Sequence, residues 1–201
     1  MIYIKLKKIK INIICLFLIF LFVTINFSPY MIIMLSCIFI HELGHIIFIK
    51  ANKLKITEID ILPFGINIAT EHKLTSYGAD ISTALSGPLS NIAYSLINLL
   101  IIKISGYNSL LMFSFLSNII YAGINLFPVR SLDGGRAWST ILKLILPEHT
   151  AYILSAVVSA IFLGILSVIA FFILMVTGYN FTLVLLCCYL FYTIHFSPNT
   201  K

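Results

Sequence analysis

Two histidines and a glutamate stand together in the stretch His41 to His45, which reads His-Glu-Leu-Gly-His and lies inside an apolar run from Tyr30 to Ile49. On a helix, residues four apart lie on one face, so the imidazoles of His41 and His45 can reach the same metal ion. Glu42 lies about 100° further round the helix axis, next to a coordination position that water can take. The spacing therefore predicts a metal centre at which a carboxylate activates water.

Chance, or two histidines that satisfy one another in a core, would be the alternative explanation of this motif. A chain of this composition would contain the pattern by chance roughly 0.002 times. Each ionisable residue in a membrane span costs about 2.5 to 3.5 kcal/mol on insertion scales, and such residues are rare outside sites and pathways. A metal site is therefore the favoured interpretation.

The composition indicates a membrane protein. Of the 201 residues, 60% are hydrophobic and 10% are charged, which is far more apolar than a soluble domain. We expect one polytopic domain over residues 1–201, with a catalytic core at about 30–138 and further spans at about 151–196. The net charge of +6 does not indicate nucleic-acid binding, because the basic residues lie at the ends of apolar runs and not on one face.

Six apolar runs are long enough to be transmembrane helices. We therefore predict an all-α polytopic membrane fold with six spans, at about Ile11 to Phe27, Tyr30 to Ile49, Ile81 to Ile102, Tyr107 to Val129, Ala151 to Thr177 and Tyr179 to Phe196. The first run follows a basic start, as in a signal peptide, but it is long and has no small-x-small cleavage site. We therefore keep it as a span.

The basic residues also predict the topology. With six spans and the amino terminus inside, twelve of the thirteen Lys and Arg residues lie on the cytoplasmic side, and only Lys103 lies outside. Cytoplasmic loops of membrane proteins carry such an excess of basic residues. We expect a multi-pass protein of the cell membrane with both termini in the cytoplasm.

The segment from Ile56 to Thr70 has a different period from the spans. Ile59 and Ile61 alternate with acidic residues, a Leu-Pro-Phe-Gly sequence typical of a turn follows, and the alternation then resumes. Alternation of this kind predicts strands. We therefore add a small β-hairpin at about residues 56–70, between the second and third spans.

A catalytic zinc ion binds three protein ligands and keeps a fourth position for water, so the two histidines need a third partner. Asp133 is the natural candidate, because it lies in the stretch Asn125 to Arg136, where a proline and two glycines interrupt the backbone at the membrane border. Asp60 and Asp80 compete with it, but they lie in a polar segment and are interpreted as solvated or interfacial groups. Three histidines lack partner spacing and are left out of the site: His72, His149 and His195.

The third span contains a short Gly-Pro stretch, Ser86 to Asn91. Gly87 and Pro88 permit a kink and a close approach between helices, and Asn91 can form a hydrogen bond across a bundle. On these residues alone, helix packing is the favoured interpretation.

Three stretches together resemble the site-2 protease family of intramembrane zinc metalloproteases. They are His41 to His45, Gly87 to Asn91 and Asn125 to Gly135, and they occur in the family's order, within a resemblance that runs from about Ser36 to Trp138. The short six-span layout, without an inserted PDZ domain, is most similar to the bacterial branch that includes the stage IV sporulation protease. That protease cleaves an inactive sigma-factor precursor.

The resemblance implies a zinc ion held by His41, His45 and Asp133, with Glu42 as the general base. It also implies polar residues near the site, Asn91 and Asn125. The implied activity is cleavage of a membrane-associated protein near the cytoplasmic side of the bilayer, for example a sigma-factor precursor or an anti-sigma factor. The implied partners are that substrate, the lipid bilayer and regulatory membrane proteins.

Two features depart from the family pattern. Many relatives carry a proline two residues before the ligand aspartate, where this chain has Ser131. The sporulation relatives often carry a regulatory CBS domain after the spans, and we expect none here.

Two other functions compete with the protease activity that the resemblance implies. A silent zinc-binding protein that sequesters a partner would not need Glu42. A secondary transporter would show repeated halves with broken helices, whereas only one half of this chain carries the histidines. Loss of cleavage with retention of zinc in Glu42→Gln would separate the protease from both.

Overall fold

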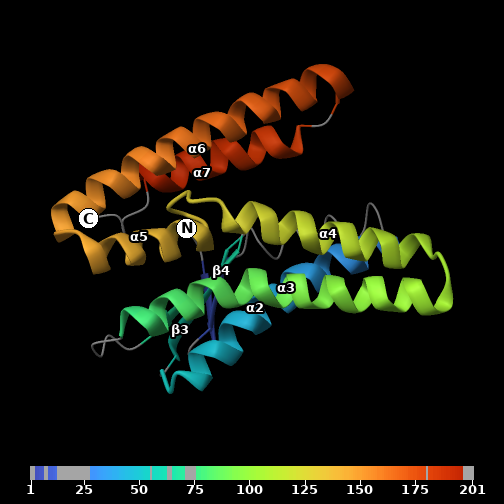
Figure 1. Ribbon diagram of the computed structural model, residues 1–201, viewed down its shortest axis with the longest axis horizontal. Coiled ribbons are helices and arrows are strands. Elements are labelled where there is room, and N and C mark those ends of the chain that lie inside the picture. The colour runs from blue at the N-terminus through green and yellow to red at the C-terminus, as the bar shows by residue number, and fades with distance from the viewer. Residues whose placement is uncertain are drawn as a thin grey trace. The chain divides into compact units, whose positions relative to one another are not determined.

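The computed structural model describes residues 3–6, 9–12, 28–54, 56–62, 65–70, 76–179 and 181–196. These residues divide into two compact units (Figure 1). The first unit comprises Met1–Ala79 and Ser86–Ala122, and the second comprises Asp80–Leu85 and Gly123–Lys201.

The first unit contains a four-stranded sheet in the order β1-β2-β3-β4. The strands are β1 (Tyr3–Leu6), β2 (Ile9–Asn12), β3 (Ile56–Leu62) and β4 (Gly65–Thr70). β1 pairs antiparallel with β2, and β3 pairs antiparallel with β4 across the segment where the sequence predicts a hairpin. β2 runs parallel to β3 and joins the two pairs into one sheet.

The predicted first span begins inside this sheet. Ile11 and Asn12 lie in β2, where they pair with Ile4 and Tyr3 of β1, so a helix at these two residues was wrong. Ile11 also pairs with Ile61, fifty residues further along the chain. The rest of the predicted span, residues 13–27, lies outside the described residues. Pairing with a distant strand is a tertiary effect that local hydrophobicity does not reveal.

Three helices, most of whose residues belong to the first unit, follow the predicted second, third and fourth spans. α2 (Pro29–Ala51) starts with Pro29 at its first position, and the Ser28 hydroxyl accepts a hydrogen bond from the backbone N–H of Met31 at 3.4 Å. α3 (Tyr77–Ser105) begins at a similar serine cap, Ser76, and carries Pro88 in its interior. α4 (Ser109–Leu126) ends before the predicted boundary, because residues 127–132 form turns.

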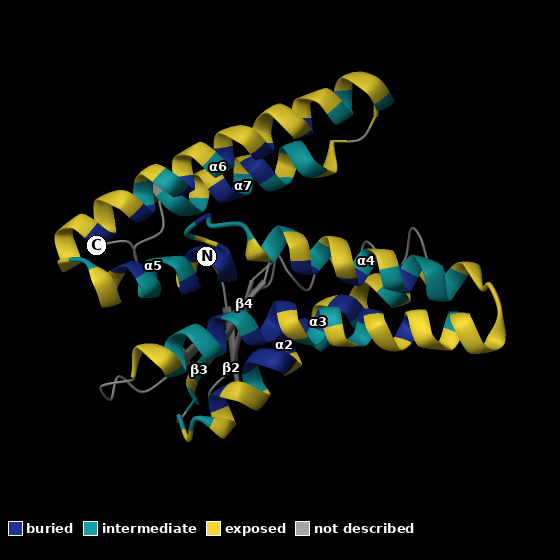
Figure 2. Ribbon diagram, in the orientation of Figure 1, coloured by how far each residue is buried: buried dark blue, intermediate teal, exposed yellow. Residues whose placement is uncertain are grey.

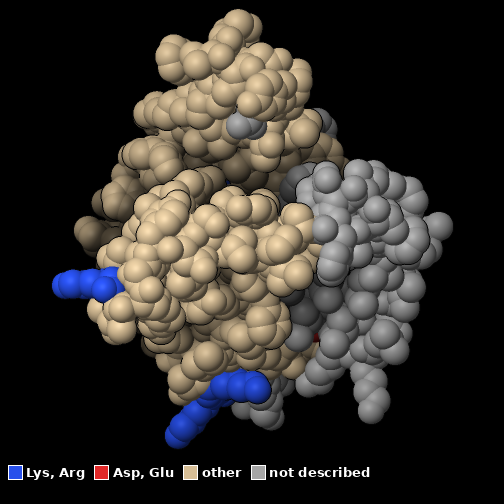
Figure 3. All heavy atoms as spheres, turned by 90° about the vertical axis from the view of Figure 1, so that its right-hand side faces the viewer, with Lys and Arg blue, Asp and Glu red and all other residues tan. Residues whose placement is uncertain are grey.

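The buried residues of the first unit include many polar ones, whereas many of its exposed residues are apolar; Figure 2 shows where buried and exposed residues lie along the helices. Asn91, Asn118 and Ser95 are 0% exposed, whereas Phe39 on α2 and Leu100 on α3 are 63% and 58% exposed. This arrangement reverses that of a soluble protein and suits helices in contact with lipid. On the face drawn in Figure 3, the described side chains are almost all uncharged, and basic side chains project from its edges.

The second unit contains α5 (Asp133–Ile145), α6 (Glu148–Thr177) and α7 (Thr182–Phe196). α6 and α7 lie side by side, joined by a turn at Gly178, whose φ of 73° is left-handed. Their core also includes the turn before α5, and its buried residues are Val129, Leu132, Leu163, Leu166, Ala170, Cys187 and Leu190.

Among the described residues, four helices are long and apolar enough to cross a membrane: α2, α3, α4 and α6. α7, at the predicted sixth span, has 15 residues and is therefore about 22 Å long, shorter than a hydrocarbon core of about 30 Å. The structure thus supports a multi-pass membrane protein, and the predicted count of six spans is not confirmed.

Helix α5 was not predicted. Its first residues are Asp133, Gly134 and Gly135, and glycine is a poor helix former, so the sequence favoured irregular backbone there. A Cβ atom on Gly134 or Gly135 would collide with the backbone carbonyl of Leu126 or Val129. The glycines therefore allow the helix to start directly against the preceding turn.

Candidate metal centre

His41, Glu42 and His45 lie on the buried side of α2, with exposures of 3%, 6% and 7%. The Nε2 atoms of His41 and His45 are 3.2 Å apart, so both rings point toward the same place. The His41 ring also packs edge-on against Tyr121 of α4, with 5.0 Å between the ring centroids. The predicted i, i+4 geometry is therefore present, inside an apolar helix.

Asn91 of α3 forms a hydrogen bond with Nδ1 of His41, the ring nitrogen that does not face His45. Its Oδ1 lies 2.9 Å from His41 Nδ1, and its Nδ2 donates to the Cys37 carbonyl at 3.0 Å. Because the amide nitrogen faces a carbonyl, the amide oxygen faces the ring and accepts the Nδ1–H of His41. A neutral imidazole with a proton on Nδ1 has its lone pair on Nε2, where a metal ligand needs it.

Ser86 contacts the second histidine, with its Oγ 3.3 Å from His45 Nδ1. A hydroxyl group both donates and accepts, so this contact suits either tautomer of His45. The stretch Ser86 to Asn91, for which packing was the favoured interpretation, thus contacts both histidines.

The separation of the two Nε2 atoms fits a tetrahedral metal ion. Metal–nitrogen bonds of about 2.05 Å, the length typical of zinc, would span 3.2 Å at an angle of about 103°. That angle is close to the roughly 109° of a tetrahedron. The two imidazoles therefore fit as two ligands of one such ion.

Two glycines allow α2 and α3 to approach this closely. A Cβ on Gly44 would contact the Ser90 side chain and would lie 2.6 Å from the Ser86 carbonyl oxygen. A Cβ on Gly87 would collide with His45 Nε2 and would lie 2.7 Å from His41 Nε2. The backbone of α3 at Gly87 thus lies directly against the two Nε2 atoms and leaves no room for a side chain.

We expect Gly87→Ala to weaken metal retention by about 10- to 100-fold, the range found when groups that orient metal ligands are changed. The added methyl group must displace at least one imidazole. Titration of the purified protein against a competing chelator measures the affinity. Gly78→Ala, also on α3, is the matched control, because nothing lies within 4 Å of its added Cβ. Equal metal affinities for the two variants would show that a side chain at position 87 does not disturb the two imidazoles.

The other predicted site residues lie in the second unit. Asp133 is the first residue of α5, is 8% exposed and lies 4.0 Å from the Nη1 atom of Arg136. Asn125 is partly buried in the last turn of α4. Of the competing acids, Asp80 is in the first turn of α3 and Asp60 is in β3.

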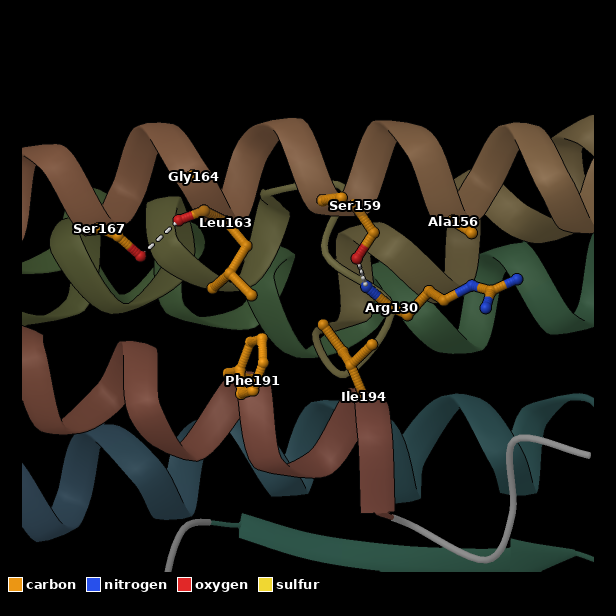
Figure 4. A pocket seen from close by; sticks show the side chains of 9 residues that line it. Arg130, Ala156, Ser159, Leu163, Gly164, Ser167, Phe191 and Ile194 are labelled. Carbon is orange, nitrogen blue, oxygen red and sulfur yellow. Dashed lines mark hydrogen bonds between the residues drawn. The ribbon is translucent and has the colours of Figure 1, made fainter.

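The turn before Asp133 is fastened to α6 at Arg130 (Figure 4). The Arg130 backbone N–H donates to Ser159 Oγ at 3.0 Å, its guanidinium donates to the Tyr152 carbonyl at 2.8 Å, and its Cζ lies 4.0 Å from the centroid of the Tyr152 ring. A cavity of about 290 Å³ beside this turn is lined by Arg130, α6 and α7 residues including Ser159, Leu163 and Phe191. The position of Asp133 thus depends on α6, which the sequence motif does not include.

Asn118 and the role of Ser86 were not predicted from the sequence. Asn118 of α4 is 0% exposed and accepts a hydrogen bond from Asn91 at 2.7 Å. The available signal was its polarity, because an asparagine within an apolar run must find a hydrogen-bond partner or remain costly to bury.

Comparison with known proteins gives a family match and a fold. Residues 29–110 match the model of Peptidase family M50, a stretch that includes His41, His45 and Asn91 but ends before Asp133. No curated protein matched the chain. The structure is similar to that of the "Site-2 Protease from Methanocaldococcus jannaschii", with a TM-score of 0.66 and 23% identity over 95% of this chain and 92% of that chain. The chain therefore has the fold of a site-2 protease and a Peptidase family M50 match across its histidine motif.

Proposed function

We propose that this protein is an intramembrane zinc metalloprotease of the site-2 type. The observation that carries the proposal is the pair of buried imidazoles on α2, whose Nε2 atoms are 3.2 Å apart and one of which is oriented by Asn91. The Peptidase family M50 match over residues 29–110 supports hydrolysis of peptide bonds.

Asp133 is the proposed third ligand. Its carboxylate would complete, with the imidazoles of His41 and His45, a set of three protein ligands. Two histidines and one carboxylate are a ligand set of catalytic zinc sites, which keep one further position for water or substrate. The buried carboxylate of Asp133 also brings a negative charge that suits a divalent cation.

The proposed mechanism uses Glu42 as general base and then as general acid. When bound, the metal ion supplies a Lewis acid that lowers the pKa of water and polarises a peptide carbonyl. Glu42 accepts a proton from the attacking water and returns it to the leaving amine as the peptide bond breaks. The two products are a new carboxyl terminus and a new amino terminus. Burial of Glu42 at 6% exposure keeps bulk water from this proton transfer.

The proposed substrate is a membrane-associated regulatory protein, such as a sigma-factor precursor or an anti-sigma factor, and the proposed location is the cell membrane with both termini in the cytoplasm. His41 and His45 precede Lys50, the basic residue in the last turn of α2, by nine and five residues. At 1.5 Å per residue they lie roughly 8 to 14 Å from that end of the helix. We therefore place the cut in the cytoplasmic part of the substrate's span or directly beside it.

The test is reconstitution of the purified protein in lipid with a single-span reporter substrate. We expect one zinc ion per chain by elemental analysis and one cut near the cytoplasmic border, mapped by mass spectrometry of the products. A protein without bound zinc would contradict the metal centre. A cut in the outer half of the bilayer would contradict the proposed topology.

A further inference from the structure

The hydrogen bond between Asn91 and His41 is one end of a longer network of side-chain amides in the first unit. Asn91 Nδ2 donates to Asn118 Oδ1 at 2.7 Å. Asn118 Nδ2 donates in turn to the backbone carbonyl of Ser114, one turn earlier in α4, at 2.8 Å. Both asparagines are 0% exposed, so water does not compete for these groups.

The orientation of both amides is fixed, because the backbone carbonyls of Ser114 and Cys37 can only accept hydrogen bonds. The Ser114 carbonyl requires the nitrogen of the Asn118 amide, which leaves the Asn118 oxygen toward Asn91. That oxygen and the Cys37 carbonyl both require the nitrogen of the Asn91 amide. The Asn91 oxygen must then face His41. If the Asn91 amide turned over, two acceptor oxygens would meet at Asn118, and the buried Cys37 carbonyl would lose a hydrogen-bond donor.

The orientation of this amide decides which nitrogen of His41 carries the proton. With the Asn91 oxygen facing the ring, Nδ1 is protonated and Nε2 keeps its lone pair. With the Asn91 nitrogen facing the ring, Nδ1 would accept and the proton would move to Nε2, the atom that points toward His45. A ring in that tautomer cannot bind a metal ion through Nε2 without losing a proton.

We infer that Asn118 is a positioning residue of the metal centre, which acts through Asn91 to hold His41 in the metal-binding tautomer. Asn118 does not contact either histidine in any described hydrogen bond. Its proposed role rests on the proposed metal function. His45 differs, because the hydroxyl of Ser86 accommodates both tautomers.

The test uses Asn118→Leu, which keeps the approximate size of the side chain but removes its hydrogen-bonding groups. In metal-free protein, ¹⁵N chemical shifts of the His41 ring report the tautomer. We expect a single Nδ1–H form in the wild type and a substantial Nε2–H population in the variant. The dissociation constant for zinc, measured against a chelator, should rise about 10- to 100-fold.

Asn118→Ser is a second variant in case the leucine disturbs folding. Serine is tolerated at such a position, since Ser95 is 0% exposed and donates to the Asn91 carbonyl one turn earlier in α3. The shorter side chain can bond to the Ser114 carbonyl but no longer presents an amide oxygen to Asn91. It should show the same change in tautomer and zinc affinity as Asn118→Leu.

Asn98→Ala is the matched control. Asn98 is also a buried asparagine between α3 and α4, at 2% exposure, and it donates to the Ser114 hydroxyl at 2.9 Å. It has no described hydrogen bond to Asn91. Its loss should lower thermal stability as a buried polar deletion does, while the His41 tautomer and the zinc affinity remain those of the wild type.

A double substitution tests whether Asn118 acts through Asn91. Asn91→Leu removes the contact to His41, so adding Asn118→Leu should weaken zinc binding no further. Additive losses, or an unchanged His41 tautomer in both Asn118 variants, would overturn the inference while the wild type still binds zinc. Absence of zinc binding in the wild type would instead overturn the proposed function.

Discussion

Replacing Glu42 with Gln is expected to lower peptide-bond cleavage by about 10²- to 10⁴-fold, the usual contribution of a general base. Gln keeps the size of the side chain but cannot accept the proton of the attacking water. Glu42 is not one of the proposed metal ligands, so the variant should bind one zinc ion with nearly wild-type affinity. Quantified cleavage of a reporter in lipid, together with elemental analysis, measures both properties.

Glu148→Gln is the control for this variant. Glu148 is the first residue of α6 and is exposed, so its replacement should leave cleavage unchanged. Full cleavage in Glu42→Gln would remove Glu42 from the mechanism. A wild-type protein that binds zinc but cleaves nothing in its own host would favour the alternative of a silent zinc-binding protein. Membrane proteins that accumulate uncut in cells with Glu42→Gln are the candidate substrates.

Asp133→Asn is expected to weaken zinc binding by more than about 100-fold, beyond the effect of changing a group that only orients a ligand, and to abolish cleavage at limiting zinc. Asparagine preserves the shape of the side chain but removes the negative charge that a divalent ion requires. Chelator competition gives the affinity. Cleavage at increasing zinc concentration then shows how much activity returns when the metal site is filled.

Two controls separate a ligand role for Asp133 from a structural one. Arg136→Gln removes the cation 4.0 Å from Asp133 Oδ1 but leaves the carboxylate, and the Arg136 side chain is 59% exposed. We expect zinc affinity within a few-fold of wild type for this variant, because exposed ion pairs contribute little. Asp80→Asn changes the competing acid on α3 and should also have little effect. A large loss of zinc in Asp80→Asn and none in Asp133→Asn would reverse the ligand assignment.

Local patterns in the sequence were sufficient for the histidine motif and for much of the helical framework. His41 and His45 lie on one side of α2 because four residues make about one helical turn, and this relation holds wherever the helix lies. The apolar runs likewise predicted α2, α3, α4 and α6, because a membrane span requires a long stretch without charges. These features depend on residues close to one another in the chain.

The missed features depend on residues that are far apart in the chain. The apolar neighbours of Ile11 predict a transmembrane span there, but Ile11 pairs with Ile61 in a sheet. Asn118 was not predicted as a site residue, because the Asn91 amide that bonds to it belongs to another helix, 27 residues earlier in the chain. Helix α5 begins at Asp133 despite two glycines, because their missing side chains let it start against the carbonyls of Leu126 and Val129.

The motif spacing therefore predicts which side chains can bind a metal. The packing of α2, α3 and α4 determines which nitrogen of His41 carries the proton. The proton on His41 is assigned by the Asn91 amide, whose orientation follows from carbonyl groups in α2 and α4. A hydrogen bond between side chains requires a distance of about 3 Å and a matched donor and acceptor. No spacing along a single helix specifies that match, because it arises only where separate helices meet.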